Sequence, residues 1–368
     1  MSKIPFFSLN IAPKSLKDEW RSAIDEVIES GQFIGGPQVK RFEESWADSV
    51  GVKHAVGVGN GLDGLVIALR ALGVGSGDNV AVPAHTFIAT WNAVKLVDAN
   101  PIGIDVNELG LMNLDILESK NIDFKCVIPV HMHGAMVDMN RLATWARERQ
   151  ILIVEDASQS HMANFGDLRA GQASDIGVFS LYPTKNLGAL GDAGIMVTDR
   201  DDLALQIRCI SNYGASPSDK YFHETFGVNS RLDSIQAAVL NVNLGHLLDW
   251  NNRRREIARH YISKIKENSH FRILNKAPET SVWHHFPLVS NVRDQLINHL
   301  KSNGISTEIH YPRTASEEFY EITGLLKVEF PIAELLAKEI FSLPISPWHT
   351  NDEILEVCNV LNEFKPWK

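Results

Sequence analysis

Short apolar runs alternate with longer amphipathic segments over the first two thirds of the chain, and this alternation limits the fold more than any other feature. The runs are rich in Val, Ile and Ala, as expected of strands buried on both faces of a sheet. Apolar residues at three-to-four spacing predict helices after Gly61, from Met139 and from Leu232. The pattern therefore predicts an α/β fold. We expect strands at 54–58, 79–84, 126–132, 151–156, 176–181 and 194–199.

Chain length and a change of pattern in the last third indicate two domains. A chain of 368 residues with 44% hydrophobic content exceeds what one core usually holds. Towards the C-terminus, a strand-like stretch at 282–290 and a helix at 294–304 predict a smaller α+β unit. We expect a large domain over 1–245 and a small one over 246–368, joined by a long or broken helix from Leu232. The N-terminal segment is expected to pack with the small domain.

The net charge and the cysteine count indicate which kinds of partner and which cellular setting to expect. A net charge of −10 argues against nucleic acid or an anionic membrane as the main partner. Three widely spaced cysteines give no disulfide framework and fit a reduced, cytoplasmic setting. We find no secretory leader and no apolar run long enough to cross a bilayer, so we expect no membrane partner.

The stretch GNGLDG, Gly59 to Gly64, matches the dinucleotide fingerprint GxGxxG between a strand and a helix. That interpretation also needs an acid about 20 residues further on, and the chain reads VPAHTF there. A glycine-rich turn into a helix still offers free backbone N–H groups and a dipole end to a phosphate. We expect a phosphate site here, and a tight turn without a ligand is the alternative.

In ILIVEDASQSH, 151–161, four apolar residues lead directly into Glu155 and Asp156. Ligands of parallel sheets bind beyond the carboxyl ends of the strands, so one carboxylate should face a site and the other should face away. A buried strand cannot hide both at low cost. The alternative is that Asp156 caps the following helix.

In SLYPTKNLGALGDAG, 180–194, a lone lysine lies in a loop of Gly, Pro, Asn and Thr. Lys185, Ser180 and Asp156 together meet the needs of a pyridoxal phosphate enzyme. The lysine supplies an amine for a Schiff base, the acid keeps the pyridine nitrogen protonated, and hydroxyls take the phosphate. The alternative is a solvent-facing loop lysine.

With these residues in view, the sequence resembles the fold type I, aspartate-aminotransferase-like enzymes, in particular the DegT/DnrJ/EryC1/StrS family of sugar-nucleotide aminotransferases. The likeness spans nearly the whole chain and implies a large, mixed, mostly parallel sheet flanked by helices, plus a small C-terminal α+β domain. It is carried by FIGGPQVKRFEESWADSVGVKHAVGVGNGLDGL, GDNVAVPAHTFIATWNAV, PVHMHGAMVDMN, VEDASQSH, FSLYPTKNLGALGDAG, GVNSRLDSIQAAVL, GISTEIHYP and SLPISPWHT.

The resemblance implies a role for each matched residue. Lys185 stands where the family's Schiff-base lysine stands, and its freed amine would move the proton during catalysis. Asp156 matches the acid under the pyridine nitrogen, and Gln159 matches a contact on the phenolic oxygen side. Ser180 matches a phosphate hydroxyl, and Phe87 matches the aromatic residue that stacks on the ring.

The phosphate end would draw on two segments. Gly61, Leu62 and Asp63 stand where backbone amides at a helix start meet the phosphate. Asn229, in GVNSRL, matches a residue offered by the neighbouring subunit, which implies a homodimer with active sites at its interface.

The chain departs from the common family pattern at three places. Leu62 replaces a Thr or Ser of many members, so backbone donors must carry more of the phosphate. His133, in HMHG, stands where tyrosine is common. The stretch 310–321, HYPRTASEEFYE, lacks the His of HYPxPxHxQ, which puts its part in substrate binding in question.

The implied reaction is amino transfer from an amino acid, glutamate by expectation, with pyridoxamine phosphate as the carrier. The NGLD turn and the lysine loop resemble the subgroup that aminates 3-keto-6-deoxyhexoses linked to dTDP, for surface polysaccharides or natural products. Amination at C4 of a UDP-, GDP- or dTDP-sugar is the alternative. Arg231 and, less favoured, the arginines at 253–255 are candidates to meet the diphosphate.

Two other function classes stay open at this stage. His131 and His133 alternate along a strand and could form a metal site with Asp156 and His161. That site would leave Lys185 unexplained, and we predict no metal. The other class is a non-catalytic relative that binds cofactor or sugar for regulation.

Overall fold

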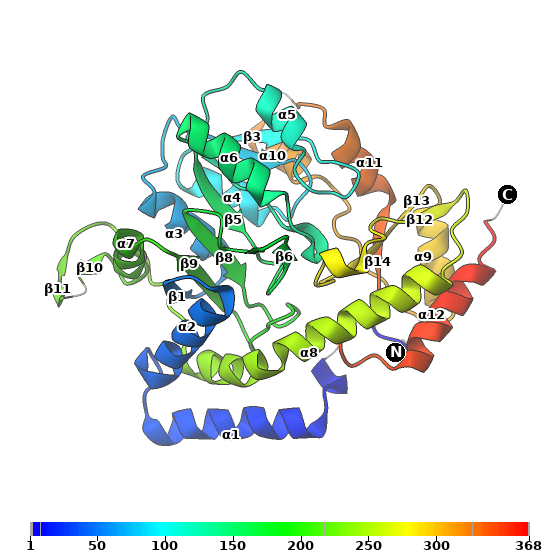
Figure 1. Cartoon of the computed structure of the whole chain (residues 1–368), viewed down its shortest axis with the longest axis horizontal. Coiled ribbons are helices and arrows are strands. Elements are labelled where there is room, and N and C mark those ends of the chain that lie inside the picture. The colour runs from blue at the N-terminus through cyan, green and yellow to red at the C-terminus, as the bar shows by residue number, and fades with distance from the viewer. Residues whose placement is uncertain (1–2, 8, 217, 326, 367–368) are drawn as a thin grey trace.

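A seven-stranded sheet forms the centre of the molecule in the computed structural model, which describes residues 3–7, 9–216, 218–325 and 327–366 (Figure 1). The strand order is β1-β9-β8-β5-β4-β2-β3, and only β9 runs antiparallel to its neighbours. The mixed, mostly parallel sheet expected from the resemblance is thus present. Its strands are β1 (His54–Val58), β2 (Asn79–Pro83), β3 (Asn100–Ile104), β4 (Cys126–Val127), β5 (Leu152–Asp156), β8 (Ile176–Ser180) and β9 (Gly194–Thr198).

Helices cover both faces of this sheet, because successive side chains of a strand point to opposite sides. On β9, Met196 packs into one buried cluster, while Ile195 and Val197 pack into the other. One face carries α3 (Gly61–Ala71), α4 (Ala89–Leu96) and α7 (Asp201–Ser211). The other face carries α2 (Gly36–Val50), α5 (Leu114–Ser119) and α6 (Met139–Arg149).

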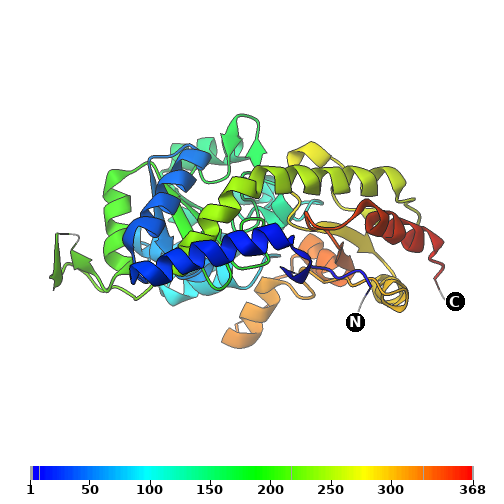
Figure 2. The same ribbon diagram turned by 90° about the horizontal axis from the view of Figure 1, so that it is seen from below.

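A smaller unit follows the 31-residue helix α8 (Ser234–Lys264). Its antiparallel sheet has the order β12-β13-β14 and shares a buried core with the second half of α8. Figure 2 shows α1 (Lys14–Ser30) lying along α8. The elements of this part are β12 (Phe271–Ile273), β13 (Phe286–Ser290), α9 (Arg293–Ser302), α10 (Ala315–Thr323), α11 (Pro331–Glu339), β14 (Ile340–Leu343) and α12 (Asn351–Glu363).

The predicted division between residues 245 and 246 lies within α8, and it stays a prediction. Ile4 pairs with Ile305 in a parallel bridge and belongs to the buried cluster of the smaller unit. No helix among the described residues is long and apolar enough to cross a membrane. The remaining short elements are η1 (Leu9–Ile11), η2 (Met132–Gly134), η3 (Pro278–Thr280), β6 (Asn164–Phe165), β7 (Leu168–Arg169), β10 (Ala215–Ser216) and β11 (Asp219–His223).

Three strand predictions differ from the structure. β3 was not predicted, and it is an edge strand, where Pro101 removes no ladder bond that the sheet needs. The strand predicted at 126–132 ends at Val127, because Pro129 has no N–H to donate and the chain turns into η2. The strand predicted at 282–290 begins at Phe286, because Trp283 adopts a left-handed backbone with φ 50°.

Candidate active site

A cavity of about 560 Å³ opens where the carboxyl ends of β5 and β8 meet the N-terminus of α3. Open α/β sheets bind ligands at this edge. Residues from the smaller unit close the opposite wall of the cavity. Seven residues predicted from the sequence line it, namely Gly61, Leu62, Phe87, Asp156, Gln159, Ser180 and Lys185.

Lys185 lies in the loop between β8 and β9, so its amine points into the cavity from the end of the sheet. The backbone N–H of Lys185 donates to the Tyr182 carbonyl at 2.9 Å. The loop also brings Gly188 close to Pro183, since a Cβ on Gly188 would lie 2.6 Å from the Pro183 oxygen. Burial lowers the pKa of Lys185 to about 8, although the charge of Asp156 opposes the shift. No described residue forms a hydrogen bond or an ion pair with its side-chain amine.

Asp156 and Glu155 divide between the two sides of β5 in the way the sequence predicts. Asp156 faces the cavity, where Oδ2 accepts from Thr90 Oγ1 at 2.9 Å and Oδ1 accepts from the Ser158 N–H at 3.2 Å. Glu155 is fully buried on the other side and accepts from His131 Nε2 at 2.9 Å and from two backbone amides. The carboxylate of Asp156 is thus held in one orientation towards the cavity.

The N-terminus of α3 packs directly against the end of β8. A Cβ on Gly61 would lie 2.9 Å from Ser180 Cβ and 3.5 Å from Ser158 Oγ, so only glycine allows this approach. The Asn60 side chain caps the helix by accepting from the Asp63 N–H at 2.8 Å, and the Asn60 carbonyl takes the Gly64 N–H. The first amides of a helix have no partner within it, so those of Gly61 and Leu62 stay available for a ligand.

Gln159 bridges two parts of the wall. Its Oε1 accepts from the His133 N–H at 2.7 Å, and its Nε2 donates to the Tyr311 hydroxyl at 3.2 Å. The Phe87 ring lies at the rim, half-exposed, with its centroid 5.5 Å from that of Tyr311. An aromatic pair at this distance leaves one face of Phe87 available to a flat ligand.

Histidines of the smaller unit form the wall opposite Asp156 and were not predicted. His285 and His310 stack with centroids 3.7 Å apart, and His284 lies beside them. Burial holds the pKa of His284 and His285 well below the ordinary value and lowers that of His310 to about 4. The wall is therefore uncharged at neutral pH. His310 and Tyr311 open the stretch 310–321, so the start of that stretch does reach the cavity.

Three of the predicted residues, Asp63, Asn229 and Arg231, lie outside the cavity lining. The Asp63 carboxylate accepts a hydrogen bond from Ser230 Oγ at 2.6 Å, and the Asp63 backbone N–H donates to the Asn60 side chain. Asn229 is exposed and pairs with Asn212 in an antiparallel bridge. Arg231 also lies away from the cavity, donating to the Asn212 side chain at 2.9 Å.

The histidines of the metal alternative have other partners. His131 is bound to Glu155, and His161 Nε2 donates to the Ser180 carbonyl at 2.9 Å. Among the described residues, no group of three or more His, Cys, Asp or Glu could hold a metal ion.

The sequence was compared with models of known protein families. The model of the DegT/DnrJ/EryC1/StrS aminotransferase family matches residues 14–362. The chain belongs to this family. Like the other DegT/DnrJ/EryC1/StrS members it is an aminotransferase, and its cofactor is pyridoxal 5′-phosphate.

Relatives within the family cover nearly the full chain. It is 39% identical over 366 residues to the dTDP-3-amino-3,4,6-trideoxy-alpha-D-glucose transaminase of Streptomyces venezuelae, covering 98% of this chain and 96% of the relative. It is 36% identical to the dTDP-3-amino-3,6-dideoxy-alpha-D-galactopyranose transaminase of Aneurinibacillus thermoaerophilus, covering 98% and 99%. The crystal structure of S. venezuelae DesV in complex with a ketimine intermediate superposes with a TM-score of 0.94 at 38% identity, covering 99% of this chain and 98% of DesV.

Proposed function

We propose that the cavity binds pyridoxal phosphate through Lys185 and Asp156, and that the enzyme aminates C3 of a dTDP-linked 3-keto-6-deoxyhexose. The observation that carries the proposal is the meeting of two groups far apart in sequence. An amine with a lowered pKa and an oriented carboxylate face one cavity, beside a helix N-terminus with two hydroxyls. These are the groups that this cofactor requires.

The ring end of the cofactor would be governed by three side chains. When bound, the cofactor supplies an electron-withdrawing ring that takes up the electron pair of the broken C–H bond. Asp156 would hold a proton on the ring nitrogen, and the Thr90 hydroxyl, which donates to Asp156 Oδ2, would fix the orientation of this carboxylate. Lys185 Nζ would accept the proton from the donor carbon and deliver it to the carbon of the cofactor that carries the amine afterwards. A pKa near 8 keeps a useful fraction of this amine neutral at physiological pH.

The phosphate end fits the pocket between α3 and β8. The close approach at Gly61 brings the amides of Gly61 and Leu62 beside the hydroxyls of Ser158 and Ser180. The helix dipole and the unpaired amides favour an anion there. Ser158 supplies a hydroxyl that Leu62 lacks, which offsets this departure from the family pattern. Phe87 would cover the ring face, and Gln159 would lie on the phenolic oxygen side.

Both transaminase relatives act in the formation of dTDP-3-amino sugars, as their names state, and both match this chain along nearly its whole length. This supports amination at C3 of a dTDP-sugar. Glutamate as the donor is what the resemblance to the family implies. The product would serve cytoplasmic synthesis of surface polysaccharides or natural products. Amination at C4 of a nucleotide sugar is the second candidate.

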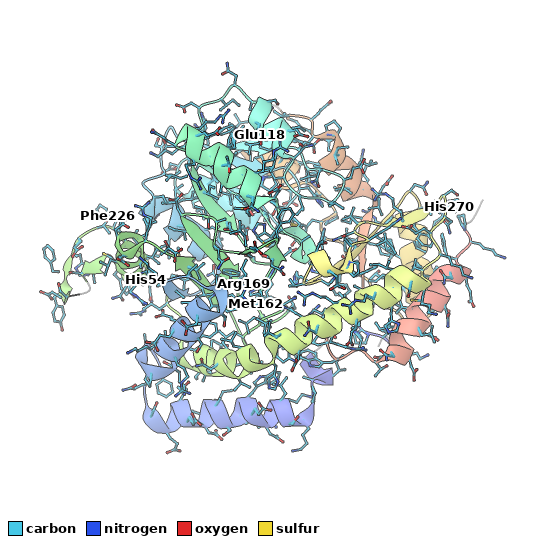
Figure 3. All side chains as sticks on the ribbon, in the orientation of Figure 1. His54, Glu118, Met162, Arg169, Phe226 and His270 are labelled. Carbon is cyan, nitrogen blue, oxygen red and sulfur yellow. The ribbon has the colours of Figure 1, made fainter. Side chains whose placement is uncertain are left out.

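We also propose a homodimer in which each Asn229 completes the partner's phosphate site. The hairpin of β10 and β11 extends away from the body of the molecule (Figure 1). Phe226, at this end of the molecule, is 96% exposed, and Tyr221 and Phe222 are exposed nearby (Figure 3). Apolar side chains gathered on a projecting arm indicate a protein contact.

The test offers the purified protein L-glutamate and a panel of 3-keto and 4-keto nucleotide sugars. The product is identified by NMR, with Lys185→Ala as the inactive control. We expect an amine at C3 of the dTDP-3-keto-6-deoxyhexose. A product formed only from a 4-keto sugar would overturn the C3 assignment, and no amino transfer to any ketosugar would overturn the function.

A further inference from the structure

The asparagine that follows Lys185 fixes the proton position on one histidine of the cavity wall. The side chain of Asn186 is buried, and its Nδ2 donates to the backbone carbonyl of Val282 at 2.8 Å. A carbonyl can only accept, so the amide group of Asn186 has one possible orientation. Its Oδ1 therefore faces His284 Nδ1, at a distance of 3.2 Å. Because Oδ1 carries no hydrogen, the imidazole must donate this bond.

A second buried asparagine, Asn251 of α8, holds Asn186 in the same orientation. Its Nδ2 donates to the His161 carbonyl at 3.0 Å, so its Oδ1 is the atom that accepts from Asn186 Nδ2, at 2.8 Å. Two backbone carbonyls thus set the direction of every hydrogen bond from α8 to His284. Buried amides with all their bonds made in one direction are costly to reverse.

His284 is consequently a neutral imidazole with its proton on Nδ1 and a lone pair on Nε2. Burial holds its pKa well below the ordinary value, and the charge of Lys185 lowers this pKa further. The ring lines the active-site cavity, whereas Asn186 does not, so Nε2 is the nitrogen left for a ligand. His133 Nε2 is sealed in the protein without a partner, but His284 Nε2 is not sealed in this way.

The other histidines of the wall have no such fixed role. His285 Nδ1 lies 3.4 Å from His133 Nδ1, and either of these nitrogens can be the donor. His310 Nδ1 lies 3.1 Å from the Ser342 hydroxyl, which can donate or accept. Of these three wall histidines, His284 is the one whose free nitrogen must be an acceptor.

We propose that His284 Nε2 accepts a hydrogen bond from a hydroxyl next to the keto carbon of the sugar substrate. The inference rests on the proposed function, because it assigns a specificity-determining residue for that substrate. A 3-keto-6-deoxyhexose has hydroxyls on C2 and C4, beside the reacting carbon. The carboxylates of an amino-acid donor have no hydrogen to give at neutral pH, so a lone pair does not suit them. An uncharged acceptor in a water-poor wall suits a sugar hydroxyl.

The first experiment compares the two half-reactions of the holoenzyme. Absorbance follows the conversion of the amine form by the ketosugar and of the aldehyde form by L-glutamate, each at several substrate concentrations. We expect His284→Leu to raise the half-saturating ketosugar concentration about 10- to 100-fold, the range for leaving a buried polar partner unpaired. His284→Gln should recover part of this loss, because its Oε1 can accept. The half-saturating glutamate concentration should change less than about 3-fold.

His299→Leu is the matched control. His299 is also a histidine of the smaller unit whose ring binds a neighbour, the Val360 carbonyl at 2.9 Å, but it does not line the cavity. We expect less than about a 3-fold change for either substrate in this variant. A ketosugar value in His284→Leu that is unchanged, or that rises no more than the glutamate value, would overturn the inference.

A measurement on the unmodified enzyme keeps the test valid if the variants do not fold. The 3-keto-6-deoxyhexose substrate is compared with its 2-deoxy and 4-deoxy analogues in the second half-reaction. A loss of efficiency with at least one analogue supports the inference and identifies the hydroxyl, while equal conversion of all three sugars would overturn it. If no ketosugar is aminated at all, the proposed function fails as well. Amination without a difference between the analogues overturns this inference alone.

The proton position can be measured without any substrate. Nitrogen NMR of the holoenzyme labelled with ¹⁵N-histidine distinguishes a protonated ring nitrogen from one with a lone pair, and the His284 signals are assigned by their loss in His284→Gln. We expect the proton on Nδ1 and a lone pair on Nε2 at neutral pH. A proton on Nε2, or a charged ring, would overturn the inference whatever the enzyme aminates.

Discussion

The lowered pKa of Lys185 makes a quantitative prediction about how the apoenzyme takes up its cofactor. Only the neutral amine attacks an aldehyde, so the rate of uptake should follow the neutral fraction of this side chain. With a pKa of about 8, roughly 9% of the amine is neutral at pH 7, against about 0.03% for the ordinary value of 10.5. Uptake at pH 7 should therefore be about 300-fold faster than for an exposed lysine.

The assay records the rate of pyridoxal phosphate uptake by the apoprotein from pH 6 to 10, with an exposed amine in solution measured as the reference. We expect the rate to level off above about pH 8 to 9. Asp156→Asn removes the charge that raises the pKa of Lys185, so the plateau should move to lower pH in that variant. An uptake rate that still rises about tenfold between pH 9 and 10 in the unmodified protein, as that of the reference amine should, would refute the reasoning.

The same shift affects stability with a defined sign. The pKa of Lys185 is lower in the folded protein than in the unfolded chain, so the unfolded chain binds more protons between the two values. The cost of burying the charged amine is fully present below about pH 8. It is relieved as the pH rises towards 10.5, so this residue should make the apoprotein more stable to denaturant across that interval.

Substitutions at three positions test the rest of the site, with Gly245→Ala as a control outside it. Gly61→Ala should weaken cofactor binding about 10- to 100-fold in an equilibrium titration, because its Cβ would lie 2.9 Å from Ser180 Cβ. A Cβ on Gly245, in α8, would have no neighbour within 4 Å, so Gly245→Ala should stabilise the protein by up to about 1 kcal/mol in denaturant unfolding. Equal cofactor affinity in Gly61→Ala and Gly245→Ala would contradict the phosphate site. Thr90→Val should shift the pH dependence of the cofactor absorbance while Thr90→Ser restores it, and identical spectra in all three proteins would contradict its role. Asp156→Asn should lower the turnover number by at least about 100-fold with the fold intact by circular dichroism, and near-normal turnover would contradict its role.

Strand patterns were readable from the sequence where buried β-branched runs had no interruption. β5 and β9 have nearly the predicted bounds, because their apolar runs continue until a polar residue ends them. β3 was not predicted because Pro101 and Gly103 belong to residue types that are rare in strands. Gly103 is required by a contact that no local pattern reveals, since a Cβ there would lie 2.3 Å from the Phe330 ring.

The two proposed catalytic side chains could be predicted to share one edge of the sheet, because Asp156 ends β5 and Lys185 lies in the loop that follows β8. Lys185 and Asp156 are chemically out of place beside apolar strands, and that contrast is visible in the sequence. Thr90 was missed, since a threonine in a helix gives no sign that its hydroxyl meets a carboxylate from β5. Tyr311 and the histidine wall come from the smaller unit, and only the tertiary fold brings them to the cavity.

Asn229 shows a different limit. It is exposed in the single chain, and its predicted place beside the phosphate depends on a second copy of the protein. A size measurement in solution, followed by mixing of Lys185→Ala with Asn229→Ala, addresses this directly. Recovery of activity in the mixed dimer would support a shared site, while no recovery from two folded, dimeric variants would contradict it.

The most direct test of the account is to locate the bond between the protein and its cofactor. The protein is loaded with pyridoxal phosphate, reduced with borohydride, digested and mapped by mass spectrometry, alongside Lys185→Ala. The account predicts a single phosphopyridoxyl group on Lys185, and a folded Lys185→Ala protein that has neither label nor turnover. A label on any other lysine, or turnover by Lys185→Ala, would contradict it.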